Sequence, residues 1–175
     1  NIRKYKTIEN LPILNLNIED GIDVHNKGWQ IRYYKFLFDI DYNEENIKDI
    51  CLNYIEGIEW TFTYYTNKCI NWQWKYKYHY PPLFEDLIKY IPYFETSLLT
   101  ENYEKITPLT QLCYVLPHSS LDIIPNNTKV LLLKKLKHKY PESYEFNWAF
   151  CKYFWESHIL LPELNINEIN DTINC

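Results

Sequence analysis

The chain has 175 residues, of which 46% are hydrophobic and 18% are aromatic, with 17 Tyr and 6 Trp. This length and apolar content are typical of one globular domain and exclude a disordered chain. The formal net charge is −5. A domain that binds nucleic acid by itself usually has a basic balance, because phosphate neutralisation supplies much of its affinity, so we expect this chain alone to bind RNA or DNA weakly.

Two features of the sequence bear on its compartment. No run of about 18 apolar residues occurs and no signal segment opens the chain, so we expect no contact with a membrane and no secretion. The cysteines are odd in number, widely spaced and free of any C-x-x-C pair, which argues against a zinc site; they are Cys51, Cys69, Cys113, Cys151 and Cys175. Scattered single cysteines favour buried thiols in a reducing compartment, the cytoplasm or the nucleus.

The first 38 residues predict a short helix after an irregular start. Residues 1–27 lack sustained periodicity and are interpreted as a connecting arm, which leaves 28–175 as the helical domain. Residues 29–38 predict a short helix, and four apolar residues define its inner face: Trp29, Tyr33, Phe36 and Leu37.

A long helix is predicted next. Asn43 is a good N-cap, and Glu44 and Glu45 stand where the helix dipole favours negative charge. Apolar residues then recur at steps of three and four over more than five turns: Ile47, Ile50, Cys51, Tyr54, Ile55, Ile58, Phe62 and Tyr65. Gly57 inside this run indicates a neighbour packed close to the backbone, and Asn67 is expected to end the helix.

The remaining elements are shorter. Segment 70–82 is too rich in Pro and aromatic residues for a regular helix, whereas short helices are expected over 84–91 and from Pro108 to the stop at Pro117. Segment 129–139 alternates leucines with solvated lysines, and 166–173 predicts a terminal helix. The predicted fold is mainly α: a single irregular helical domain with aromatic-rich loops and few or no strands.

No catalytic centre is predicted from residue chemistry. A metal-dependent nuclease needs carboxylates that converge on two cations, but Glu56, Glu59, Glu85 and Asp86 are dispersed and more typical of solvated faces. The segment His118-Ser119-Ser120 with Asp122 is too compact for a hydrolase triad and favours a turn or a helix cap. We therefore assign no catalytic residue and no metal ligand to this chain.

Residues 70–82, with the sequence INWQWKYKYHYPP, are the most unusual stretch. Aromatic rings interleaved with cations are typical of surfaces on which single-stranded nucleic acid stacks. The same rings are equally typical of a packed core. Composition alone leaves both interpretations open.

The order of five sequence blocks resembles the XRN family of 5′→3′ exoribonucleases, in the helical region that follows their catalytic core. The blocks are WQIRYYKFLF (29–38), YIEGIEWTFTYYTNKCINWQW (54–74), YKYHYPP (76–82), PLTQLCYVLPHSS (108–120) and WESHILLPEL (155–164). Departures occur where Lys68 replaces a glycine, where Lys77 and Pro81 replace a proline and an alanine, and where Ala149-Phe150-Cys151 replaces Asn-Gly-Lys.

The resemblance implies roles for particular residues. Trp72 and Trp74 match the family's W-x-W, near which a tryptophan stacks on the RNA base beside the active site. Lys75 and Lys77 are candidates to line the RNA path, and His79 is a candidate to orient the loop. One tryptophan and the tyrosines of the stretch are expected in the core, with Trp72 favoured as the stacking ring.

The resemblance also implies what lies outside the chain. The family's catalytic acids, its Mg²⁺ ions and its pocket for the 5′-phosphate belong to an N-terminal catalytic domain that precedes this region. The chain contains 0 Met and begins at Asn1, which favours a piece of a longer protein. We predict part of a Mg²⁺-dependent exoribonuclease that degrades 5′-monophosphorylated RNA, inactive as this segment alone. The alternative is a non-catalytic structural or interaction protein descended from that domain.

Overall fold

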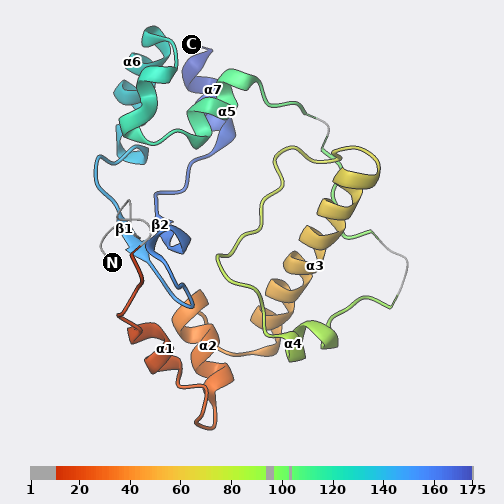
Figure 1. Cartoon of the computed structure of the whole chain (residues 1–175). Coiled ribbons are helices and arrows are strands. Elements are labelled where there is room, and N and C mark those ends of the chain that lie inside the picture. Colours follow the sequence, from red (N-terminus) through yellow and green to blue (C-terminus); the bar gives the residue numbers. More distant parts are fainter. Residues whose placement is uncertain (1–10, 94–96, 103, 175) are drawn as a thin grey trace. The chain divides into compact units, whose positions relative to one another are not determined.

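The computed structural model describes residues 11–93, 97–102 and 104–174 (Figure 1). Within these residues the chain forms two compact units. Unit 1 contains the residues up to Glu104 together with Trp148–Ser157, and unit 2 contains Lys105–Asn147 together with the residues from His158 onward. The chain crosses between the two units three times, so their boundary is not a single linker. Residues 1–10 of the predicted arm and Cys175 lie outside the described residues.

Unit 1 contains four α-helices and a short 3-10 helix among its described residues. They are α1 (Asn17–Ile22), α2 (Trp29–Phe38), α3 (Glu44–Thr66), α4 (Phe84–Lys89) and η5 (Phe154–Glu156). Helix α1 packs against α2, and α3 packs against α4. Helix α1 lies inside the range predicted as a connecting arm; the division of the chain at residue 27 stays a prediction.

The bounds of the first long helices follow from their sequence signals. Helix α2 covers the predicted residues, and α3 begins after Asn43, whose side-chain oxygen accepts a hydrogen bond from the N–H of Asn46 at 2.9 Å. Asn67 ends α3, as predicted. Helix α4 begins at Phe84 and ends at Lys89, two residues before the predicted end.

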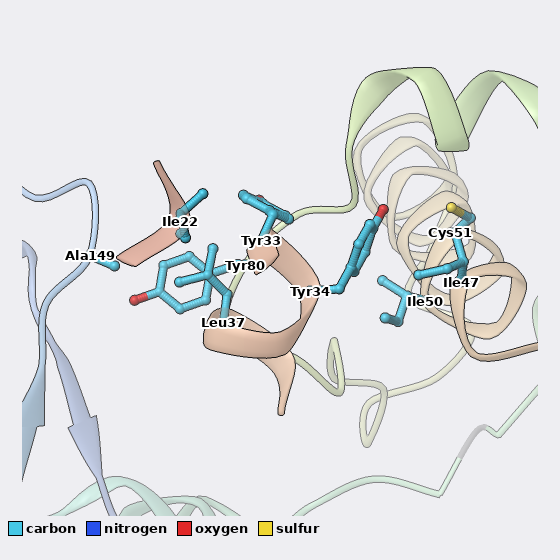
Figure 2. Packing of buried hydrophobic residues seen from close by; sticks show 9 residues of the cluster. All are labelled: Ile22, Tyr33, Tyr34, Leu37, Ile47, Ile50, Cys51, Tyr80 and Ala149. Carbon is cyan, nitrogen blue, oxygen red and sulfur yellow. The ribbon is translucent and has the colours of Figure 1, made fainter. Parts of the chain in front are cut away.

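The core of unit 1 gathers residues from the helices and from two loops (Figure 2). Its buried members are Ile22, Tyr33, Tyr34, Leu37, Ile47, Ile50, Cys51, Tyr80 and Ala149. The predicted inner face of α2 is partly wrong: Phe36 is about half exposed, whereas Tyr34 is fully buried. Burial raises the pKa of Tyr33 to about 12 and that of Cys51 to about 11, because both ionised forms lose solvation.

Tyr34 is buried because its hydroxyl has partners. It donates to Oδ2 of Asp86 at 3.0 Å and accepts from the N–H of Leu83 at 3.0 Å. Asp86 also accepts from Tyr42 at 3.2 Å and from Lys89 at 2.8 Å. The prediction of a solvated Asp86 is therefore wrong, since these three donors compensate the burial of its carboxylate.

The apolar face of α3 is buried only along its first half. Ile47, Ile50 and Cys51 lie in the core, but Ile58 and Tyr65 are exposed and Phe62 is 68% exposed. The periodicity therefore predicted the helix correctly but not its burial. The second half of α3 presents an apolar surface with no core residue against it among those described.

Unit 2 is built from short helices around its own core. Its helices are α5 (Pro108–Val115), η3 (His118–Ile123), α6 (Asn126–Lys135), η4 (Lys137–Lys139) and α7 (Ile166–Ile173). Strands β1 (Glu145–Asn147) and β2 (His158–Leu160) pair antiparallel, with Phe146 opposite Ile159. The core comprises Cys113, Leu121, Ile124, Leu132, Leu136, Tyr140 and Ile169.

Two of these helices match their predictions closely. Helix α5 has Pro108 in its first turn, where a missing N–H costs nothing, and the Thr107 side chain caps it by accepting from the N–H of Thr110 at 3.1 Å. Helix α7 has the predicted bounds. With its helices and one small two-stranded sheet, the described chain confirms the mainly α fold with aromatic-rich loops.

Phe150 occupies a backbone conformation that an L-residue rarely adopts. Its φ is 58°, and its N–H donates to Oε1 of Glu19 at 2.6 Å. The resemblance implies a glycine in this triplet, and a residue without Cβ adopts positive φ without strain. The Phe150 ring, which is 55% exposed, lies 6.4 Å from the ring of Tyr33.

We expect Phe150→Gly to be more stable than Phe150→Ala by about 1 kcal/mol, because both variants lose the ring but only alanine keeps the strained Cβ. The free energy of unfolding in urea measures the difference. Ala149→Gly is the matched control: Ala149 is buried without positive φ, so glycine there should destabilise. A glycine variant no more stable than the alanine variant at position 150 would contradict the strain.

Candidate nucleic-acid interface

The side chains of segment 74–80 alternate between two faces. The even-numbered residues are wholly or partly buried: Trp74, Tyr76, Tyr78 and Tyr80. The odd-numbered residues are exposed: Lys75, Lys77 and His79. The interleaving of rings and cations in the sequence thus becomes a separation in space, with the rings toward the protein and the cations toward solvent.

Helix α3 contacts this segment at Asn53 and at Gly57. The N–H of Lys77 donates to Oδ1 of the buried Asn53 at 3.0 Å. One turn further along α3, Gly57 faces the Trp74 ring so closely that a Cβ at position 57 would lie 2.5 Å from Cη2 of Trp74. The prediction that a neighbour packs against Gly57 is confirmed, and the neighbour is one of the two predicted site tryptophans.

The Trp74 ring belongs to a stack of three aromatic rings. Trp60 lies between Tyr64 and Trp74, with ring centroids 5.3 Å and 5.6 Å apart and interplanar angles of 11° and 20°. The Trp60 Nε1–H donates to the carbonyl oxygen of Asn71 at 2.8 Å. This hydrogen bond fixes the chain immediately before Trp72.

Trp72 differs from Trp74 in its surroundings. Its side chain is 48% exposed. The structure records neither a ring contact nor a hydrogen bond for that side chain with the residues it describes. The Trp74 ring, in contrast, is occupied on the face that meets Trp60.

The tyrosines of the segment are held by hydroxyl and ring contacts. The Tyr76 hydroxyl donates to the carbonyl oxygen of Tyr80 at 2.8 Å, and the Tyr33 hydroxyl donates to that of Pro81 at 2.9 Å. The Tyr76 ring packs edge-on against Tyr54 and Tyr78. Burial raises the pKa of Tyr76 well above its usual value. These rings belong to the packed side of the segment.

Two hollows flank the segment. An apolar groove of about 540 Å³ is lined by Tyr54, Gly57, Ile58, Thr61, Phe62, Trp74 and Tyr76. A smaller polar pocket of about 300 Å³ is lined by Asp49, Leu52, Asn53, Glu56, Lys77, Tyr78 and Leu98. The groove thus joins the exposed half of α3 to the Trp74 ring, and the pocket contains Lys77, one of the predicted RNA-path residues.

The carboxylates considered for catalysis are spread among separate structural contacts. Glu56 accepts from Asn53 at 3.0 Å, whereas Glu59 accepts from the Ser97 hydroxyl at 2.6 Å and the Leu98 N–H at 2.9 Å. Across 11–93, 97–102 and 104–174, no three His, Cys, Asp or Glu side chains lie close enough to hold a metal ion.

The compact His118-Ser119-Ser120 segment forms a turn of 3-10 helix, as favoured from its sequence. Asp122 of the same turn is bound by Lys129 at 2.6 Å, which lowers the pKa of its carboxyl group. This carboxylate is thus engaged by a lysine on α6.

Sequence reasoning missed three residues that build this surface: Asn53, Trp60 and Tyr64. They share one stripe of α3 with Gly57, at positions separated by four, three and four residues, which places them along one helix face. An available signal was the spacing of Trp60 and Tyr64 from Gly57, because a glycine beside aromatic residues on one face indicates a packing site for another ring.

Comparison with known proteins identifies relatives of this sequence. The sequence matches the family described as the Xrn1 helical domain over residues 5–174. It is 32% identical over 150 residues to the 5′-3′ exoribonuclease 2 of Gallus gallus, covering 82% of this chain and 15% of that protein. It is 28% identical over 162 residues to the 5′-3′ exoribonuclease 2 of Schizosaccharomyces pombe, covering 89% of this chain and 16% of that protein.

The family match covers nearly the whole chain, so the chain belongs to the Xrn1 helical domain family, as its sequence blocks indicated. It spans about 15% of the length of the exoribonucleases it matches. None of the helices in the described ranges is both long enough and apolar enough to cross a bilayer.

We expect Gly57→Leu to destabilise the chain by about 1–3 kcal/mol, because the new side chain displaces the Trp74 ring. Urea denaturation measures the change. In a Trp74→Ala background the ring is absent, and Gly57→Ala should then stabilise α3 by about 1 kcal/mol through helix propensity. If Gly57→Leu raised stability in the native background, the close packing on Trp74 would be refuted.

Proposed function

We propose that this chain is the helical domain of a 5′→3′ exoribonuclease that degrades 5′-monophosphorylated RNA, where it supports the catalytic domain and stacks on single-stranded RNA through Trp72. The relatives' names supply the reaction class. The observation that carries the stacking role is the half-exposed Trp72 indole, in a chain whose preceding carbonyl, that of Asn71, accepts a hydrogen bond from Trp60.

The two tryptophans have different proposed tasks. Trp74 is packed on Gly57 and Trp60 and positions the segment, whereas Trp72 contacts a base. A processive enzyme must hold a moving strand without reading its sequence, and stacking of about 1–3 kcal/mol per base does this for any base. Lys75, Lys77 and His79 lie on the exposed face of the same segment, where cations would lie along the RNA path.

The supporting role is carried by the second half of α3. Ile58, Phe62 and Tyr65 are exposed beside an apolar groove, and apolar surface of this kind is typical of an interface within a larger protein. We propose that the catalytic domain, which supplies the Mg²⁺ ions and the 5′-phosphate pocket by resemblance to the family, covers it. The four described cysteines are free thiols, which supports a reducing compartment, cytoplasmic or nuclear.

The alternative is a non-catalytic structural or interaction protein descended from this domain. Departures from the pattern of the family motivate it, at Lys68, Lys77, Pro81 and Ala149. The coding sequence upstream of Asn1 separates the two proposals. A block with clustered acidic residues and a basic phosphate pocket supports the enzyme, and unrelated sequence or a stop codon supports the alternative.

In the longer exonuclease, we expect Trp72→Ala to fold normally and to lose processive degradation, with the loss similar for all four bases because a stack reads no base edges. Cleavage of very short substrates should survive better than that of long ones. Product-length analysis on 5′-monophosphorylated RNA measures both effects.

The matched variant is Trp74→Ala. It should lower the free energy of unfolding by about 2–3 kcal/mol, less than the roughly 3–5 kcal/mol of a fully buried ring, since Trp74 is half buried. If both variants lost stability and neither showed a processivity defect, the stretch would be core throughout and the RNA-stacking role of Trp72 would be wrong.

The purified 175-residue chain should release no mononucleotides from 5′-monophosphorylated RNA with Mg²⁺ or Mn²⁺, because its described carboxylates do not converge. Its RNA affinity should be no better than non-specific binding, about 10⁻⁴ M or weaker at physiological salt. Metal-dependent release of nucleotides would contradict this prediction and direct attention to Glu56, Glu59, Glu85 and Asp86.

A further inference from the structure

Positive charge is concentrated in one short part of unit 2. Five of the chain's 18 lysines and arginines fall within residues 129–139, and no Asp or Glu occurs between Asp122 and Glu142. The chain as a whole carries a net charge of −5, so this local excess runs against its composition. The segment forms α6 and η4 (Figure 1).

The segment is a fixed part of its unit. Thr128, Leu132, Leu136 and Tyr140 are buried, and the Tyr140 hydroxyl donates to the carbonyl oxygen of Cys113 at 2.7 Å. Helix α6 packs against α7 and against η3. The cations that project from it are therefore presented from a helical scaffold instead of a loose loop.

Two of the five lysines have structural partners. Lys129 binds Asp122 at 2.6 Å, and Lys139 donates to the carbonyl oxygen of Glu163 at 2.6 Å. The other three, Lys134, Lys135 and Lys137, are exposed, and so is His138. For these three lysines the structure records no ion pair or hydrogen bond of the side chain with any residue it describes.

We propose that Lys134, Lys135, Lys137 and His138 form a second RNA contact, which binds the phosphate backbone of single-stranded RNA. This inference rests on the proposed function for the identity of the polyanion. Lysine ammonium groups act as point charges on phosphates and read no sequence, which suits a strand that must move along its enzyme. These residues belong to unit 2, whereas the stacking contact at Trp72 belongs to unit 1.

A purely structural role is the competing explanation. Lys134 and Lys135 lie in the last turn of α6, where a cation is stabilised by the helix dipole. That role accounts for stability alone and gives no salt-dependent affinity for RNA. It also leaves Lys137 and His138 in η4 unexplained, beyond the end of α6.

The test is RNA binding by the 175-residue chain, measured by fluorescence anisotropy with a labelled oligouridine between about 50 and 200 mM salt. The patch variant is Lys134→Gln/Lys135→Gln/Lys137→Gln. The control variant, Lys27→Gln/Lys48→Gln/Lys105→Gln, removes the same charge from three lysines that are also exposed. A Lys→Arg variant at the three patch positions keeps the charge, and circular dichroism checks the fold of each.

The patch variant should bind at least roughly tenfold more weakly at low salt, and the slope of log affinity against log salt should fall by roughly 2, because each phosphate contact on a single strand contributes about 0.7. The control and the Lys→Arg variants should bind like the native chain. Equal losses in patch and control variants, or no loss in either, would overturn the inference.

Two further outcomes separate this inference from the proposed function. Stronger patch-dependent binding of polyglutamate than of RNA would identify an acidic protein segment as the partner and overturn the RNA contact. An absence of any RNA binding by the native chain at low salt would overturn it as well. Neither result touches the stacking role of Trp72, which is decided by processivity in the longer enzyme.

Discussion

One stripe of α3 organises unit 1. The Asn53 amide oxygen accepts a hydrogen bond from the backbone of the aromatic segment, and Gly57 leaves room for the Trp74 ring. The rings of Trp60 and Tyr64 continue the stack that begins at Trp74. Helix α3 is anchored in the core through Ile47, Ile50 and Cys51, and it therefore fixes the position of the segment. The rings of segment 74–80 pack against the protein, whereas Trp72 and the cations are exposed.

The predictable part of the fold is the part determined by local signals. The Asn43 cap and the apolar periodicity gave the bounds of α3, and Pro108 gave the start of α5. Burial was less predictable because it depends on distant partners. Tyr34 is buried through an aspartate 52 residues away, and Phe62 is exposed because no core residue of the described chain reaches it. The alternation over 74–80 was missed because the segment forms no strand and the chain bends at residues 77–80.

Two departures from the pattern implied by the resemblance, at Lys77 and Phe150, are accompanied by local hydrogen bonds. Lys77 stands where the resemblance predicts a proline, and its N–H, which a proline lacks, is the donor to Asn53. Phe150 stands in a triplet where a glycine is expected, and its strained backbone is tied by the hydrogen bond to Glu19. These two contacts keep the local structure in place at both positions.

The two proposed RNA contacts respond to different physical variables. Stacking at Trp72 removes apolar ring surface from water and depends little on salt, whereas phosphate contacts at Lys134, Lys135 and Lys137 release counterions and weaken steeply as salt rises. In the proposals, the base contact would therefore persist at high salt and the backbone contact would be lost. Neither contact reads base edges. A domain with a net charge of −5 can therefore assist a sequence-independent nuclease when its few cations are placed outward and its rings are used mainly for its own packing.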